Sequence, residues 1–106
     1  MSNYMRILLL FDLPVKTKKQ RRDYTRFRNY LLNEGFDMMQ FSVYCRLCNG
    51  HESMERQIEK ISKHLPPKGQ IRALPITEKQ YERMRILLGD RTSNEKKVTI
   101  NQLTLF

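Results

Sequence analysis

The chain has 106 residues, enough for one domain with a modest core but too short to enclose a deep substrate cavity. Its 20 Lys and Arg against 11 Asp and Glu give a formal net charge of +9, which points to nucleic acid and, more weakly, to anionic lipid. The apolar runs are far shorter than a membrane span, no export-signal pattern is visible, and Cys45 and Cys48 are too few for a disulfide framework. We therefore expect a cytoplasmic protein with no membrane partner.

The first predicted element is the apolar run Ile7 to Phe11, which has the length and the bounding proline of a strand buried on both faces rather than of a helix. It ends in Asp12, and Pro14 then stops further sheet pairing. Two interpretations of Asp12 remain open, a turn-capping residue or a catalytic Mg²⁺ ligand. Because one carboxylate makes a poor Mg²⁺ site, the second interpretation needs a symmetric dimer that pairs two copies of Asp12, where the metal would activate water for nuclease chemistry.

A helix of about four to five turns is predicted next, since Tyr24, Phe27 and Leu31 follow helical spacing and Gly35 is suited to end it. The stripe opposite them is polar. Seven cations within thirteen residues, opposed by Asp23 alone, exceed what solubility requires. We favour sequence-independent, salt-sensitive contact with phosphates over a merely solvated helix face. The cations are Lys16, Lys18, Lys19, Arg21, Arg22, Arg26 and Arg28.

The segment from Phe36 to Leu47 is predicted to be a strand that is bent or split near Phe41 and Ser42, which leaves a kinked strand and a tight hairpin both open. Asn49 and Glu52 have the spacing of a capping box for the following helix. The buried stripe of that helix is predicted to contain Met54, Ile58, Ile61 and Leu65, and Pro66-Pro67 should end it.

Gly69 is expected to turn the chain into a strand from Gln70 to Ile76. The box from Thr77 to Gln80 should open a short helix with Tyr81 and Met84 facing inward. Ile86 to Leu88 reads as a short apolar edge strand. We assign residues 1–90 to one domain and residues 91–106 to a linker and a C-terminal strand or docking tail.

This order of elements predicts an α+β fold, a ferredoxin-like β-α-β-β-α-β sandwich with an extra C-terminal edge strand and its helices on one face of the sheet. The bare face needs a cover. Two copies packed sheet to sheet would supply it, so we expect a two-fold homodimer.

The C-terminal residues Gln102, Leu103, Leu105 and Phe106 resemble the short peptide by which many bacterial DNA enzymes dock on the replication sliding clamp. An extra strand, exchanged across the dimer, is the alternative. Cys45 and Cys48 resemble half of a zinc knuckle, but neither His51 nor His64 completes one, so we expect no zinc site.

Several pieces together resemble one family. They are Phe11-Asp12-Leu13-Pro14, the basic helix ending in Leu31 to Phe36, Gln40 to Tyr44, Ile76 to Tyr81, and Gly89-Asp90. The family is that of the small CRISPR-associated adaptation proteins and endoribonucleases, the ferredoxin-like partners of the CRISPR integrase, in the branch found beside single-protein RNA-guided effectors. The resemblance covers residues 4 to about 90.

The resemblance implies a homodimer that bridges two integrase dimers during spacer acquisition and carries double-stranded DNA on its basic surface. It also implies a Mg²⁺-dependent nuclease of RNA or DNA whose metal ligand is Asp12, with Phe41 and Ser42 near the site. In some members the nuclease chemistry is dispensable for integration, so the resemblance does not decide whether Asp12 still acts. Two alternatives remain open, a free-standing ferredoxin-like ribonuclease toxin and a non-catalytic RNA-binding module.

Overall fold

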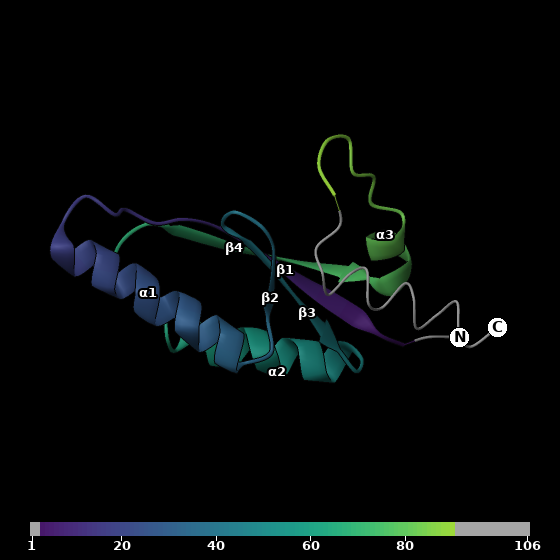
Figure 1. Cartoon of the computed structure of the whole chain (residues 1–106). Helices are drawn as coiled ribbons and strands as arrows, with labels where there is room; N and C mark the ends of the chain where they lie inside the picture. The colour runs from purple at the N-terminus through teal and green to yellow at the C-terminus, as the bar shows by residue number, and fades with distance from the viewer. Residues whose placement is uncertain (1–2, 91–106) are drawn as a thin grey trace.

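The computed structural model describes residues 3–90 of the chain as four strands and three helices (Figure 1). The strands form one sheet in the order β2-β3-β1-β4, in which all neighbours are antiparallel. This is the ferredoxin-like arrangement that the sequence predicts. The elements are β1 (Met5–Asp12), α1 (Lys18–Asn33), β2 (Asp37–Gln40), β3 (Val43–Cys48), α2 (His51–Ser62), β4 (Gln70–Thr77) and α3 (Glu78–Glu82).

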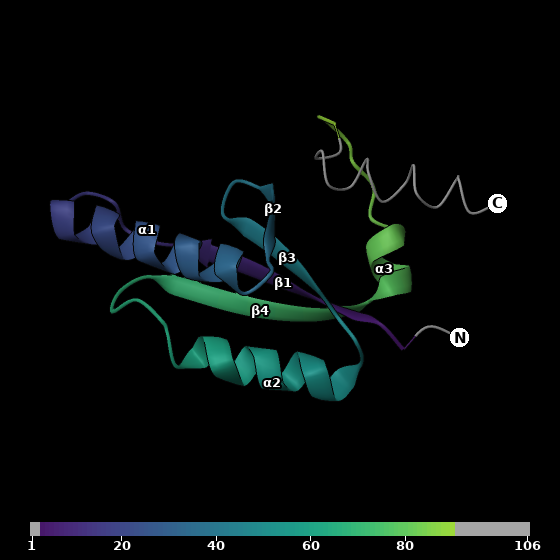
Figure 2. The ribbon, with the colours of Figure 1, turned by 60° about the horizontal axis from the view of Figure 1, so that its bottom comes forward.

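The core lies between the sheet and the two long helices, which share one face of the sheet (Figure 2). Strand β1 contributes Ile7, Leu9 and Phe11 to it, and α1 contributes Phe27 and Leu31, as their spacing predicts. On the other face of β1, Leu8 is buried but Leu10 is 40% exposed. The expectation that this run is buried on both faces therefore holds only in part within one chain.

Helix α3 lies on the opposite face of the sheet from α1 and α2 (Figure 1). The capping box predicted at Thr77 and Gln80 is present and opens it. Arg6, which also lies on this face, donates to both carboxylate oxygens of Glu78 at 2.7 and 3.0 Å, and its guanidinium lies 3.8 Å from the ring centroid of Tyr81. Burial acts to lower the pKa of Arg6, but the hydrogen bond and the charge of Glu78 together raise it. The pair anchors α3 to the sheet.

The segment from Phe36 to Leu47 is a hairpin rather than a kinked strand. Strands β2 and β3 pair antiparallel, and Ser42 takes a φ of 64°, the left-handed conformation that a tight turn requires. The structure thus resolves the alternative that the sequence left open.

Four details of the predicted elements are wrong. Gly50, not Asn49, occupies the cap position of α2, and no side-chain cap bond forms there because glycine has no side chain. Helix α2 ends at Ser62, before the prolines, so Leu65 lies outside it and is 50% exposed. Residues Ile86 to Leu88 form no strand, since none of the described strands pairs with them, and Met84 is exposed rather than inward.

Candidate nucleic-acid interface and acidic strand end

Asp12 is the last residue of β1, at the centre of the sheet, and its side chain is exposed. It is the register partner of Gln70 in β4. Because side chains alternate along a strand, Asp12 lies on the same face as Leu8 and Leu10, which is the face that α1 and α2 leave uncovered. Its carboxylate makes no hydrogen bond or ion pair with the other residues from 3 to 90 and is therefore free to accept one.

The turn at Phe41 and Ser42 lies beside this strand end. The backbone N–H of Phe11 donates to the carbonyl oxygen of Ser42 at 3.1 Å, so the turn is fixed one residue away from Asp12. The side chain of Phe41 is 82% exposed. The structure thus brings the turn that the sequence assigns to the site against the end of β1, with an exposed aromatic ring on that turn.

One copy of the chain does not supply a divalent-metal site within the described region. No group of three or more His, Cys, Asp or Glu side chains comes together there. Mg²⁺ prefers several oxygen ligands, so Asp12 fits this ion only when further carboxylates, phosphates or waters complete the set. A second copy of Asp12 is the simplest protein ligand to add.

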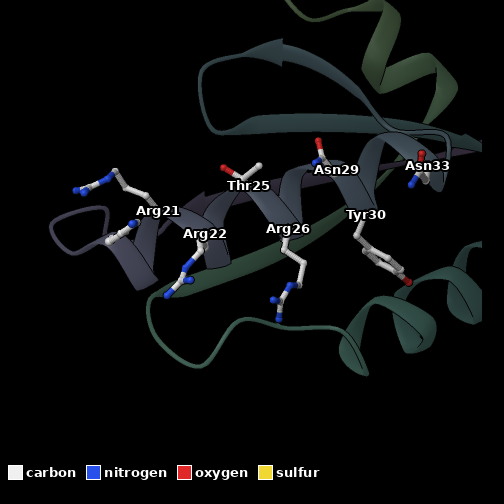
Figure 3. A pocket seen from close by; sticks show the side chains of 8 residues that line it. Arg21, Arg22, Thr25, Arg26, Asn29, Tyr30 and Asn33 are labelled. Carbon is white, nitrogen blue, oxygen red and sulfur yellow. The ribbon is translucent and has the colours of Figure 1, made fainter.

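The basic surface is built on the outer side of α1 (Figure 3). Helical geometry places side chains four residues apart in rows, and a shallow groove of about 720 Å³ runs along two such rows. Its lining contains four cations and no acid, so the groove attracts anions. Lys18, Arg22, Arg26 and Tyr30 make one row, and Arg21, Thr25, Asn29 and Asn33 make the other.

The seven predicted cations are not equivalent. Lys19 forms an ion pair with Asp23 at 3.2 Å and lies outside the groove. Arg21 donates to the carbonyl oxygens of Val15 and Lys16 at 3.2 and 3.0 Å, so it is held against the preceding loop. Arg22 and Arg26 project from the helix side by side in Figure 3 and have no hydrogen-bond or ion-pair partner among residues 3–90. They and Lys18 are the cations best placed to contact phosphates. Lys16 is exposed in the loop before α1, and Arg28 is half-buried on the helix.

Tyr30, which lines the groove, belongs to a cluster between α1 and α2 that the sequence patterns do not predict. The ring of Tyr30 stacks on His64 with ring centroids 4.3 Å apart. Burial and the nearby charge of Glu34 raise the pKa of the Tyr30 hydroxyl. Glu34 accepts hydrogen bonds from Lys60 at 2.8 Å and from Gln57 at 3.2 Å. These contacts join α1 to α2, and no local pattern could have revealed them because the partners lie more than twenty residues apart in sequence.

The predicted docking residues Gln102, Leu103, Leu105 and Phe106 lie outside the described residues, as does the predicted C-terminal strand. Cys45 and Cys48 are both buried and form no disulfide within the described residues. They lie on opposite faces of β3, so they cannot converge on one metal ion. None of the helices described between residues 3 and 90 is both long and apolar enough to cross a membrane.

Comparison with known proteins identifies what the chain resembles. Residues 5–84 match the family model described as CRISPR associated protein Cas2. A relative from Campylobacter jejuni is 50% identical over 99% of this chain and 73% of its own length, and one from Acidovorax ebreus is 47% identical over 96% and 100%. A third, from Ligilactobacillus salivarius, is 48% identical over 80% and 84%. All three relatives carry the name CRISPR-associated endoribonuclease Cas2.

Proposed function

This chain belongs to the CRISPR-associated Cas2 family, and from that premise we propose that it is a homodimeric subunit of CRISPR adaptation. In this role it binds double-stranded DNA on its basic surface and bridges integrase dimers in the cytoplasm, and paired copies of Asp12 form a Mg²⁺-dependent endoribonuclease centre. The name of the relatives supports the nuclease part, and the net charge of +9 supports the nucleic-acid part. The observation that carries the proposal is the position of Asp12 on the face of the sheet that α1 and α2 leave uncovered.

That face has the properties of an interface between two copies. Leu10 and Leu47 are 40% and 44% exposed, and Leu74 on the neighbouring strand is 49% exposed. Exposed apolar side chains on one sheet face favour packing against another such face. When two copies pack in this way about a two-fold axis, each Asp12 comes to the interface on the same face as its neighbouring leucines. The apolar cover and the second carboxylate therefore come from the same partner.

The proposed chemistry assigns separate work to separate residues. The free cations Lys18, Arg22 and Arg26 bind the phosphate backbone without reading sequence. Phe41 offers a ring on which a base near the strand end can stack. The two Asp12 carboxylates hold Mg²⁺, which when bound polarises the scissile phosphate and lowers the pKa of a water ligand.

The proposal is tested first by replacing Asp12 with Ala in the full chain. We expect the variant to remain a dimer in light scattering and to bind a DNA duplex as the native chain does, but to lose Mg²⁺-dependent cleavage of single-stranded RNA. Asp37→Ala is a matched control, because Asp37 is also an exposed acid but lies on β2, away from the end of β1. Cleavage that survives Asp12→Ala, or a native chain that is monomeric, would contradict the proposed centre.

The binding surface is tested by the triple reversal Lys18→Glu, Arg22→Glu, Arg26→Glu. Each phosphate contact contributes about 0.9 to the steepness with which log affinity falls against log salt concentration. The triple variant should therefore bind duplex DNA far more weakly, and its affinity should depend less on salt. Lys63→Glu with Lys79→Glu, two exposed lysines on other elements, is the control. Unchanged duplex binding by the triple variant would place the DNA elsewhere. Co-purification of the dimer with its integrase then tests the bridging role.

A further inference from the structure

A second hollow lies beside Asp12 and is lined by residues of the loop that follows β1, of the loop that precedes β4 and of α1. The two loops are held very close together. Gly69 has a φ of 111°, and a Cβ built on it would come within 2.7 Å of the carbonyl oxygen of Asp12 and of a methyl carbon of Leu13. The wall formed by Pro66 and Pro67 is therefore fixed next to the residues that continue from the proposed cleavage centre.

The walls of the hollow suit a flat apolar group. Leu13 and Pro14 form one side, the two prolines form the other, and Tyr24 contributes its ring. That ring packs edge-on against Phe11 at 6.3 Å, which ties it to the end of β1. The hollow has a volume of about 270 Å³, slightly below the range of about 300–1,000 Å³ that is typical of sites for drug-sized ligands. It has room for one planar ring system rather than for several nucleotides.

Two charged groups that are paired with each other, Lys19 and Asp23, line the same hollow. Asp23 is recessed, with its side chain 19% exposed, and one of its oxygens, Oδ2, pairs with Nζ of Lys19 at 3.2 Å. Its other oxygen, Oδ1, has no hydrogen-bond partner within residues 3–90. The pair thus presents an ammonium donor next to a carboxylate acceptor. Guanine can meet this pair at three points, with two N–H donors on the carboxylate and a carbonyl acceptor on the ammonium. Adenine can meet it at only two, with one amino donor and one ring-nitrogen acceptor.

We propose that this hollow binds one unpaired guanine base of a single-stranded nucleic acid, with the carboxylate of Asp23 accepting from its N–H groups and Lys19 donating to its carbonyl oxygen. The proposal deepens the nuclease function proposed above and rests on it for the class of ligand. A base held here lies next to Leu13, so the hollow sets the position of the strand relative to Asp12. Lys68, which also lines the hollow, is available to the phosphate of the same nucleotide.

The test measures base preference without cleavage. The full chain, labelled with nitrogen-15, is titrated with guanosine 5′-monophosphate and with adenosine 5′-monophosphate, so that the phosphate is matched and only the base differs. We expect the guanine nucleotide to bind about tenfold more tightly, since guanine donates one more hydrogen bond to the Asp23 carboxylate than adenine does and a bond to a charged group is worth about this factor. The largest shifts should fall on Thr17, Tyr24 and Lys68.

Asp23→Asn should bring the two affinities together while the fold is kept, because Asp23 sits on a helix surface and the amide has the same shape. Glu52→Gln is the matched control, since it removes an acid from the i,i+4 pair with Arg56 on α2 and should leave the preference intact. Equal binding of both nucleotides to the native chain, or shifts confined to the groove of α1, would overturn the proposal.

The failure of this proposal is distinguishable from the failure of the proposed function. Asp12 does not line the hollow, so Asp12→Ala must keep the guanine preference whether or not the chain cleaves RNA. If the native chain cleaves RNA but shows no preference between the two nucleotides, the guanine site is ruled out and the proposed nuclease function stands. If the chain prefers the guanine nucleotide but never cleaves RNA, the proposed nuclease function is ruled out and the guanine site stands.

Discussion

Tyr44 lies at the centre of the core with no exposed surface, and its ring stacks on Phe11 with centroids 5.4 Å apart. Its hydroxyl is buried and has no hydrogen-bond partner within the described residues. An unpaired buried hydroxyl costs stability, so Tyr44→Phe should raise the free energy of unfolding by about 1 kcal/mol. Urea denaturation followed by circular dichroism measures the change. A lower stability would instead mean that the hydroxyl bonds to a buried water or to a residue outside 3–90.

Single residues differ in how far the sequence reveals them. The alternation in β1 and the helical spacing in α1 predict Ile7, Phe27 and Leu31 as core, because each signal is local. Gln57 is also buried, at 8% exposure, and no pattern predicts a polar residue there. It is tolerated because its amide donates to Glu34, which lies 23 residues away in the chain.

At the scale of elements, the connection between α2 and β4 depends on Gly69. A Cβ there would collide with the backbone of Asp12, and a φ of 111° disfavours any L side chain. Gly69→Ala should therefore lower the free energy of unfolding by roughly 1–3 kcal/mol. Gly89→Ala is the control, since Gly89 has a similar φ of 96° but no heavy atom within 4 Å of the added carbon. Equal costs for the two variants would mean that the contact with Asp12 contributes nothing.

The ends of α1 and α2 are joined by the ion pair between Glu34 and Lys60. The hydrogen bonds from Lys60 and Gln57 lower the pKa of Glu34 below its ordinary value of 4.5, and the hydrogen bond to Glu34 raises the pKa of Lys60 above 10.5. The contribution of Glu34 to stability is complete above pH 4.5 and is lost as the pH falls through the lower pKa of the folded state. That of Lys60 is complete below pH 10.5 and is lost as the pH rises through its raised pKa.

Glu34→Gln should therefore reduce stability by a constant amount between these limits, and the difference from the native chain should shrink at both extremes of pH. Thermal unfolding at a series of pH values measures it. Glu55→Gln is the control, because Glu55 is an exposed acid on α2. Its effect on stability should not show this dependence on pH. A difference that persists unchanged in strong acid would show that the amide disrupts packing rather than the ion pair.

Elements are predictable where their signals are local and fail where they need a partner. The capping box at Thr77 is a local signal and is confirmed. Ile86 to Leu88 have the composition of a strand, but a strand forms only where another strand pairs with it, and none of the described strands pairs with these residues. The hairpin at Ser42 depends on one left-handed residue that is not glycine, which the composition of the segment does not indicate.

At the scale of the whole molecule, the order of elements predicts the ferredoxin-like sandwich because few topologies fit so short a chain. Of the candidate site, the sequence predicts the acid, the basic helix and the turn. It could not predict that the turn bonds to Phe11 beside Asp12, since that contact depends on tertiary packing. The contacts of Lys19 and Arg21 are local, an i,i+4 ion pair and hydrogen bonds to the preceding loop, but the count of cations alone does not indicate them. The second copy stays a prediction, because nothing within one chain contains it.

The pairing of Asp12 across a dimer makes a prediction about mixtures. If both carboxylates belong to one centre, a dimer with a single Asp12→Ala subunit is as inactive as one with two. When native and variant chains exchange freely and are mixed equally, only the dimers with two native subunits cleave, so about a quarter of the activity remains. Two independent centres would instead leave about half, one for each native subunit. Cleavage rates measured across a series of mixing ratios, at constant total protein, should therefore follow the square of the native fraction. A linear dependence would mean that the two copies of Asp12 act in independent centres. A shared centre would then not explain the apolar face of the sheet.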